Sequence, residues 1–281
     1  MERVVDLKVL SWNVEHFTGA GTGSRRDRVA RVAGYVAGEA PDIFAIMEVE
    51  SGRVFSEFVN RMPGYVFAIT EGPQTQETLI GIRHGITAFM TQKNEFKRNN
   101  PGLRPGALVT VTAPDGSHLP ILFNHLKSLP SPEGFGLRDA MFEKAFGLKR
   151  TLDGVSEGLG QEVRFILAGD LNTMGMTLKD SDQDITAAEE IARLDRRFRR
   201  YGMVRLPKTH DTTFNNGSTS SYAPADLDHV FATETLTFVD QGQGAKVHVG
   251  GWAVEAEDAS RDDWIARFSD HAPLMFTVTG L

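Results

Sequence analysis

The sequence predicts a fold in which β-sheets are covered by α-helices. Short apolar runs typical of buried strands recur along the whole chain, and segments with helical periodicity lie between them. This interleaving argues against an all-β barrel. No internal repeat, low-complexity block or Pro/Gly/Ser-rich linker divides the 281 residues, so we expect one domain spanning residues 1–281.

The strands are expected where the apolar runs have the length of a buried strand. In chain order, these runs are residues 4–12, 42–49, 85–91, 107–112, 119–124, 163–168, 227–232 and 274–278. They are distributed from one end of the chain to the other, so every part of the sequence contributes to the expected sheets.

The helices are expected in three segments between the strands. In residues 25–38, the apolar side chains that share one face are Val29, Val32, Ala33, Val36 and Ala37. Pro41 stops this segment from continuing. Residues 138–157 and 185–200 have the same periodicity, so each is expected to cover a sheet.

The composition narrows the chemistry that the chain can carry out. The absence of cysteine excludes disulfides, thiolate metal sites and a cysteine nucleophile, so any metal must bind to oxygen or imidazole. Thirty Lys and Arg against 37 Asp and Glu give a net charge of −7, which argues against coating nucleic acid by bulk charge. A local basic strip remains compatible with this total.

No targeting or membrane-spanning segment is expected. The first residues mix acidic and basic side chains and lack an apolar stretch followed by a cleavage site. The longest apolar runs, such as residues 165–168, are far shorter than the roughly 18 residues of a membrane span. We therefore expect a cytoplasmic protein, although secretion after removal of a leader is compatible with the sequence.

Polar residues gather at the ends of the expected strands, where a rigid strand can aim a side chain without burying an unpaired charge. The segments concerned are residues 11–15, 46–50, 124–128, 169–172, 226–229 and 269–273. Taken alone, most of these segments are typical of turns or surface hydrogen bonds. Glu48 is harder to explain in this way, because it sits where a buried strand would keep an apolar side chain, and a buried carboxylate needs a partner or a metal.

Six motifs at these strand ends occur in an order that is characteristic of one family. They are Trp12-Asn13, Glu48, Asn124-His125, Asp170 with Asn172, Asp228, and Asp270-His271. In this order and spacing, they resemble the endonuclease/exonuclease/phosphatase superfamily, which includes pancreatic deoxyribonuclease. The resemblance covers nearly the whole chain and implies an α+β, four-layer sandwich, in which two mixed sheets pack face to face with helices outside.

The resemblance also implies a divalent metal ion held by oxygen ligands. Glu48 and Asp270 offer carboxylates and Asn13 offers an amide oxygen, a set suited to Mg²⁺ or Mn²⁺ rather than zinc, with Ca²⁺ as an alternative. Glu15 matches an acid of the abasic-site endonuclease branch that many relatives lack, and it is a further candidate ligand. The number of metal ions stays open.

The same comparison implies catalytic roles for five residues. Asp170 resembles the group that orients or deprotonates the attacking water, and Asn172 the one that holds the phosphate or the nucleophile. His271 resembles the histidine that contacts the scissile phosphate, and Asp228 the acid that fixes its ring tautomer. His125 matches a histidine of the deoxyribonuclease and sphingomyelinase branches and is a candidate general acid or phosphate ligand.

Two further segments are rich in residues that bind phosphate. Residues 19–26 are glycine-rich and include Arg25 and Arg26, but they lack the G-x-G-x-x-G spacing, so we interpret them as a flexible loop. Residues 193–208 hold seven basic side chains against one acid. This run is typical of a solvated helix face; the alternative is a track for a phosphate backbone that includes Arg196, Arg197 and Arg200.

These features predict metal-dependent hydrolysis of phosphodiester bonds, with DNA as the expected substrate of an endonuclease. We expect a monomer without an obligate protein partner. The alternative enzyme is a phosphatase or phosphodiesterase that acts on a small molecule or a lipid headgroup. A binding module that has lost catalysis is disfavoured, because none of the acid and histidine positions of the family is missing.

Overall fold

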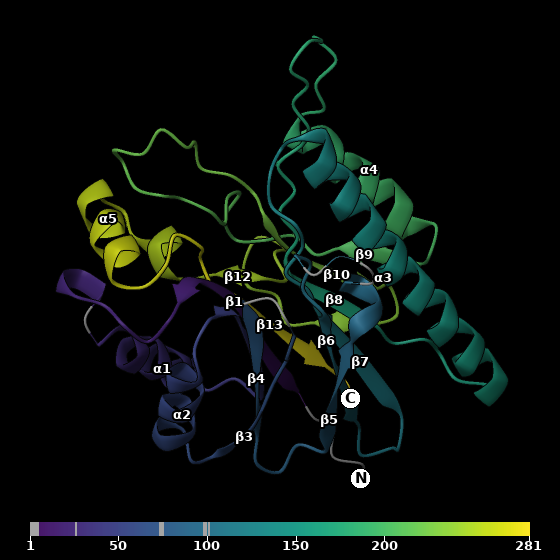
Figure 1. Ribbon diagram of the computed structural model, residues 1–281. Helices are drawn as coiled ribbons and strands as arrows, with labels where there is room; N and C mark the ends of the chain where they lie inside the picture. Colours follow the sequence, from purple (N-terminus) through teal and green to yellow (C-terminus); the bar gives the residue numbers. More distant parts are fainter. Residues whose placement is uncertain (1–5, 26, 73–75, 98–99, 101) are drawn as a thin grey trace.

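Two β-sheets pack face to face and α-helices cover both outer faces, as the computed structural model shows (Figure 1). The structure describes residues 6–25, 27–72, 76–97, 100 and 102–281. The expected α+β four-layer sandwich is therefore confirmed.

The first sheet is built around the N-terminal strand. Its strands, in spatial order, are β11 (Thr237–Phe238), β13 (Leu274–Thr279), β1 (Leu7–Phe17), β2 (Ile43–Val49), β4 (Glu77–Arg83) and β3 (Tyr65–Ile69), and β12 (His248–Val249) also pairs with β13. Only β1 and β2 pair in parallel, so the sheet is mixed.

The second sheet is assembled from the middle of the chain. Its strands, in spatial order, are β5 (Ala88–Lys93), β6 (Gly106–Thr112), β7 (His118–Phe123), β8 (Ile166–Asp170), β10 (Asp228–Thr233) and β9 (Met203–Arg205). Here only β7 and β8 pair in parallel. Each sheet thus has one parallel pair near its centre, and polar residues follow or end the strands of both pairs.

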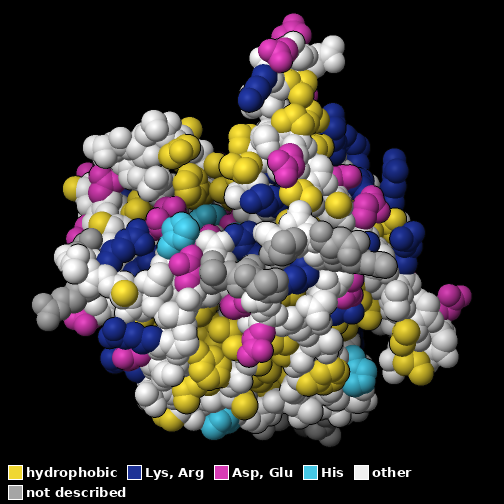
Figure 2. Space-filling model, viewed as in Figure 1, with side chains coloured by type: hydrophobic (Ala, Val, Ile, Leu, Met, Phe, Trp, Pro, Cys, Tyr) yellow, Lys and Arg dark blue, Asp and Glu magenta, His cyan; other side chains and the backbone are white. Residues whose placement is uncertain are grey.

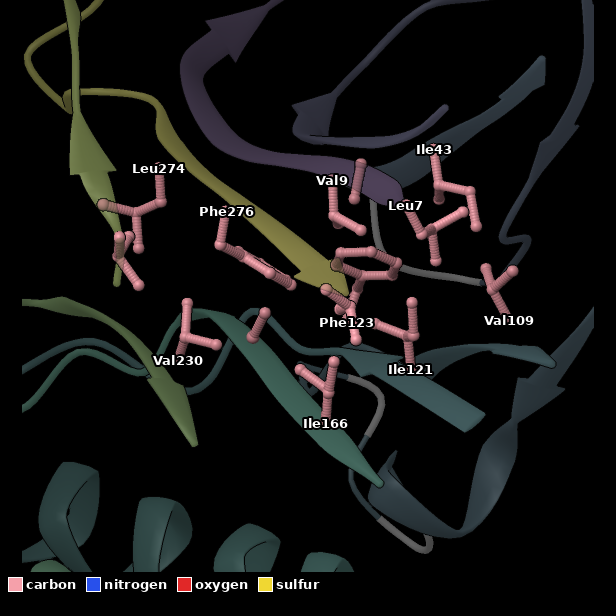
Figure 3. Packing of buried hydrophobic residues seen from close by; sticks show 14 of the residues in the cluster. Leu7, Val9, Ile43, Val109, Ile121, Phe123, Ile166, Val230, Leu274 and Phe276 are labelled. Carbon is pink, nitrogen blue, oxygen red and sulfur yellow. The ribbon is translucent and has the colours of Figure 1, made fainter. Parts of the chain in front are cut away.

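The core lies between the two sheets. Val9 and Phe276 from the first sheet face Phe123, Ile166 and Val230 from the second, and the side chains interdigitate (Figure 3). All five side chains are almost completely buried. Burying a side chain of this size contributes about 1.5–3 kcal/mol, so this layer fixes the distance between the sheets and with it the site at their edge.

Helices close both outer faces with further apolar clusters. The first sheet is covered by α1 (Arg28–Glu39) and α2 (Gly52–Arg61), through Val32 and Phe58 among others, and Trp264 of α5 (Asp258–Arg267) packs against the same cluster. The second sheet is covered by α3 (Pro132–Leu159) and α4 (Ala187–Arg199), through Phe146 and Phe198. Short 3₁₀ turns occupy Gly23–Arg25, Asn94–Lys97 and Gly251–Val254. None of the described helices is long and apolar enough to cross a membrane.

Several strand boundaries differ from the expected ones. β1 continues to Phe17 instead of ending at residue 12, because the pairing with β2 shifts register after Asn13 and then resumes. Residues 4 and 5 of that expected strand lie outside the described residues. The run expected from residue 85 begins at Ala88, because Gly85 adopts a φ of 92° in the turn that leads to the second sheet. β8 also extends two residues further, to Asp170.

Helix ends differ from the expected ones because capping residues set them, and apolar periodicity does not detect caps. α3 begins at Pro132, six residues before the expected start, because Ser131 accepts a hydrogen bond from the Gly134 amide and proline occupies the first turn. α4 begins after Thr186, which forms a capping box with Glu189. The helix expected from residue 25 begins at Arg28.

Some elements were not expected at all. Helix α2 is only ten residues long and buries two side chains, Val54 and Phe58, whereas α5 buries one and has a weak apolar periodicity. β3 leaves most of its side chains partly exposed, and Gly81 interrupts the apolar run of β4. The short strands β9, β11 and β12 were missed because two or three residues carry no detectable period.

Gly169 offers a test of how tightly the two parallel strands of the second sheet approach. A Cβ atom at this position would lie 2.1 Å from the carbonyl oxygen of Asn124, and the φ of 139° disfavours any other residue. We expect Gly169→Ala to lower the free energy of unfolding by about 1–3 kcal/mol in urea denaturation. The matched control is Gly154→Ala at an open position in the C-terminal part of α3, which should raise it by about 1 kcal/mol. An unchanged stability for Gly169→Ala would contradict the close approach.

Candidate active site

Most of the polar residues singled out in the sequence lie together at one edge of the sandwich. Asn13 comes from β1 and Glu48 from β2, while Asp170 and Asp228 come from β8 and β10. His125 follows β7, and His271 precedes β13. Figure 2 shows histidine, acidic and basic side chains gathered on this face of the molecule, between the loop of residues 210–226 and the hairpin of residues 176–186.

Asn13 joins the two sheets at the centre of the site. Its amide nitrogen donates to Glu48 Oε1 at 3.0 Å and to Asp170 Oδ2 at 2.9 Å. Because the Asn13 nitrogen is used in this way, its oxygen Oδ1 points elsewhere, and it is buried without a hydrogen-bond partner among the described residues. A buried amide oxygen without a partner is costly and marks a place that a cation or a donor would satisfy.

Two histidines flank the Asp170 carboxylate. His125 Nε2 lies 3.4 Å from Asp170 Oδ2 and 3.6 Å from Glu48 Oε1. His271 Nε2 lies 3.8 Å from the same Asp170 oxygen, while its Nδ1 contacts Asp228 Oδ2 at 2.8 Å. The Asp228 contact fixes the orientation of the His271 ring, so that Nε2 faces the centre of the site.

The two histidines differ in protonation. Burial opposes charging of His271, but Asp228 and Asp170 outweigh it and raise the pKa well above its ordinary value. Burial and the positive charges of Arg104 and His271 lower the pKa of His125 well below its ordinary value. His271 is therefore a cation and His125 a neutral ring near pH 7, so the site combines a fixed positive charge with a neutral hydrogen-bonding group.

Two carboxyl groups at the site have raised pKa values. Burial raises the pKa of Asp170 to about 7, helped by Asp228, although the His271 charge opposes this. Burial raises the pKa of Asp270 to about 6, helped by the nearby charges of Glu15 and Glu48. Both shifts arise mainly because burial removes the carboxylates from water and so disfavours their charged form.

The donor set fits a divalent cation. Glu48, Asp270 and Glu15 offer carboxylate oxygens, and the unpartnered Oδ1 of Asn13 is an oxygen of the kind that Mg²⁺ and Mn²⁺ bind. Glu15 also pairs with Arg25 at 2.5 Å, so a metal would compete with that arginine for it. Arg26, the other arginine of the glycine-rich segment, lies outside the described residues.

Asn172 lies behind the Asp170 carboxylate. Its backbone amide donates to Asp170 Oδ1 at 3.0 Å, and its side-chain nitrogen donates to the Leu126 carbonyl at 3.1 Å. Asn172 adopts a φ of 50°, which asparagine tolerates better than most residues. In this arrangement it connects the loop after β8 to the loop after β7.

Three residues at the site were not identified from the sequence. Arg104 precedes β6, and its pKa is lowered by burial while Glu48 and Asp170 partly restore it. Gln76 donates to Glu48 Oε2 at 2.8 Å, and the amide of His16 donates to the same oxygen at 2.9 Å. None of the three belongs to a polar motif at a strand end, so only the folded structure reveals them.

The arginines of α4 lie apart from this cluster. Arg197 forms ion pairs with Asp139 and Glu143 on α3, so it ties the two helices together. Arg196 and Arg200 are exposed and, within the described ranges, form no ion pair. They line a cavity of about 320 Å³ between α3 and α4. None of the three contacts a described carboxylate or histidine of the site.

Comparison with known proteins identifies related sequences and folds. A model of the Endonuclease/Exonuclease/phosphatase family matches residues 10–271. No curated protein matches the sequence. Similar solved structures include truncated TDP2 from Caenorhabditis elegans, which is 19% identical, covers 98% of each chain and has a TM-score of 0.65.

Two further solved structures have a similar fold. D. rerio TDP2, complexed with a single-strand DNA product, is 19% identical over 97% of this chain and 98% of that chain, with a TM-score of 0.60. A mannosyl-6-phosphatase from Bacteroides thetaiotaomicron is 16% identical over 97% of this chain and 99% of that chain, with a TM-score of 0.58. At these identities the similarity shows the fold.

The raised pKa of Asp170 predicts how stability depends on pH. From about pH 4 to about pH 7, the folded protein keeps this carboxyl protonated while the unfolded chain releases the proton. Asp170 therefore stabilises the fold at low pH, and this contribution is lost as the pH rises through that range. The Asp170→Asn variant lacks this titration. As the pH rises through this range, its free energy of unfolding relative to that of wild type should therefore increase by up to about 1.4 kcal/mol per pH unit.

Urea denaturation in EDTA between pH 4 and pH 8 measures this difference. Asp180→Asn, a change at an exposed acid of the neighbouring hairpin, is the matched control and should keep a constant offset from wild type. A constant offset for Asp170→Asn as well would mean that Asp170 titrates like an ordinary aspartate.

Proposed function

The chain belongs to the Endonuclease/Exonuclease/phosphatase family, and on this premise we propose that it is a metal-dependent phosphodiesterase that cleaves DNA as an endonuclease. Members of this family are divalent-metal-dependent hydrolases of phosphoester bonds. The observation that carries the proposal is the environment of the Asp170 carboxylate. Its carboxylate, with a pKa of about 7, contacts Asn13 and lies beside both histidines.

Asp170 is the proposed proton acceptor for the attacking water. A base with a pKa near the working pH combines a useful ionised fraction with a good affinity for the proton. Two donors aim its oxygens, because the Asn172 amide holds Oδ1 and the Asn13 side chain holds Oδ2. The carboxylate therefore reaches the water in one fixed orientation, which lowers the entropic cost of proton transfer.

The two histidines are proposed to bind the scissile phosphate. The His271 cation, held by Asp228, provides positive charge for the phosphoryl oxygens. His125 is neutral without substrate, so it first acts as a hydrogen-bond donor. The negative charge of a bound phosphate favours its protonation, and the protonated ring can then supply a proton to the leaving oxygen.

Glu48, Asp270 and Asn13 are the proposed metal ligands, with Glu15 as a further carboxylate. A bound Mg²⁺ or Mn²⁺ would neutralise developing charge on the phosphoryl oxygens. Its binding would also compensate the two buried carboxylates whose pKa values are raised. Ca²⁺ is the alternative for the same oxygen ligands.

DNA is the favoured substrate because positive charge lies beside the site. The charges of Arg104 and Lys127 are close enough to His125 to lower its pKa, and both residues are partly exposed. A phosphodiester chain offers several anionic groups that such cations could bind. One solved structure of this fold holds a single-strand DNA product, which supports the same choice. The phosphatase of similar fold supports the alternative, a small-molecule phosphoester.

Hydrolysis assays test this function directly. We expect supercoiled plasmid to be nicked in Mg²⁺ or Mn²⁺ and not in EDTA, and Asp170→Asn to reduce the rate by about 10²–10⁴-fold. Asp180→Asn should retain the wild-type rate. Cleavage of p-nitrophenyl phosphate or of bis-(p-nitrophenyl) phosphate without any cleavage of DNA would replace the proposal with the small-molecule alternative.

The exposed arginines of α4 provide a separate test of how DNA is bound. If Arg196 and Arg200 contact the phosphate backbone, the double change to Gln should weaken DNA cleavage at low salt and flatten its salt dependence. Lys144→Gln with Arg150→Gln removes the same charge from exposed positions of α3 and is the control. Equal salt slopes for the two double variants would assign these arginines to a solvated helix face.

A further inference from the structure

A buried ion pair joins the two helices that cover the second sheet. Arg138 of α3 is completely buried and binds Glu190 of α4 through two parallel contacts of 3.0 Å. Burying both charges costs free energy that one ion pair rarely repays by itself. The remaining contacts of the pair indicate what it does.

Those remaining contacts reach the two loops that carry site residues. Arg138 Nη1 donates to the carbonyls of Lys127 and Leu129, at 3.4 and 2.7 Å, in the loop after β7. Arg138 Nη2 donates to the Gly175 carbonyl at 2.7 Å, in the loop after β8. Glu190 accepts a hydrogen bond from the Gly175 amide at 2.7 Å. The pair therefore binds both loops as well as both helices.

These loops position His125 and Asn172 at the site. They also contact each other directly, since Asn172 donates to the Leu126 carbonyl and the Thr177 amide donates to the Pro130 carbonyl at 2.7 Å. A shift of either loop would therefore move both His125 and Asn172 relative to Asp170.

The first loop contains a residue in an unfavourable conformation. Leu129 adopts a φ of 91°, in a region where a leucine is sterically strained, and the residue is 52% exposed. Apolar burial therefore does little to hold this conformation in place. The hydrogen bond from Arg138 to the Leu129 carbonyl is available to do so, and strained residues persist only where their surroundings fix them.

We propose that Arg138 and Glu190 form a clamp that positions His125 and Asn172 by holding the loops after β7 and β8, including the strained turn at Leu129. The clamp would serve the phosphodiester hydrolysis proposed above, and this inference rests on that proposed function. Arg138 and Glu190 are positioning residues, because no contact connects them to Asp170 or to either histidine. A brace between helices alone would have no need of the three loop carbonyls.

The test replaces the pair without leaving a buried charge. In Arg138→Met/Glu190→Met, apolar side chains of similar length keep the helices packed but cannot bind the loop backbone. We expect kcat for plasmid nicking to fall at least tenfold with a smaller change in KM. The control is Arg205→Met/Asp195→Met, which removes another two-contact ion pair, between β9 and α4; Arg205 also lies 4.0 Å from Asp226 but contacts neither loop. Its kcat should stay within twofold of wild type.

A third change separates positioning from general stabilisation. Glycine adopts a φ of 91° without strain, so Leu129→Gly added to the Met/Met variant should recover at least threefold in kcat. A helix brace gives no reason for such a rescue. No recovery, or a wild-type kcat in the Met/Met variant, would overturn the clamp. If the Met/Met variant does not fold, Arg138→Lys, which keeps the charge but not the planar fork, is compared with and without Leu129→Gly by the same criterion.

Trypsin cleavage after Lys127 provides a measurement that needs no substrate. Without the clamp, the loop should open and the fragment ending at Lys127 should form at least fivefold faster, while the Arg205/Asp195 control cleaves at the wild-type rate. Faster cleavage in a protein that hydrolyses no phosphoester would keep the loop-holding role and reject the function that it serves. Unchanged cleavage would reject the clamp whatever the substrate is.

Discussion

The burial of the Asp170 carboxylate is the constraint on which the rest of the site depends. An unpaired carboxylate in this position would be expensive, so its surroundings must either protonate it or supply positive charge. The structure does both, because the pKa is raised to about 7 and the His271 cation lies nearby. Asp228 in turn stabilises that cation. The result is a carboxyl group with a pKa near neutral pH beside a positive charge, as the proposed base and the proposed phosphate ligand require.

The fold explains how these groups come to one place. Each sheet contains a parallel pair, β1 with β2 and β7 with β8, and the carboxyl ends of these four strands lie at the same edge of the sandwich. Asn13 spans the gap between the sheets and contacts a carboxylate from each. The apolar layer between the sheets sets the width of that gap, so the packing of the core and the geometry of the site are linked.

Much of this organisation could be predicted from the sequence, for physical reasons. Buried strands leave apolar runs, and an acid such as Glu48 directly inside such a run is unusual enough to indicate a site. Arg104 and Gln76 could not be identified, because an isolated polar residue in a loop has no pattern that reveals what it faces. The arginines of α4 show the same limit, since Arg197 pairs with acids more than fifty residues away in the chain.

The helix boundaries could not be predicted for a different reason. Apolar periodicity detects the buried face of a helix, whereas its ends are set by capping residues such as Ser131 and Thr186. The contacts of Arg138 could not be predicted from the sequence either, because its partners are backbone carbonyls of two separate loops. Long-range contacts of one side chain with several loops leave no local trace in a sequence.

The most direct measurement is the titration of Asp170 itself. In protein with ¹³C-labelled aspartate, the Cγ resonance assigned by its loss in Asp170→Asn reports the ionisation of this carboxyl. The account predicts a midpoint near pH 7 in EDTA and a lower midpoint when Mg²⁺ is added, because a cation at the neighbouring oxygen ligands stabilises the ionised form. A midpoint near 4 that Mg²⁺ does not move would contradict both the proposed base and the proposed metal site.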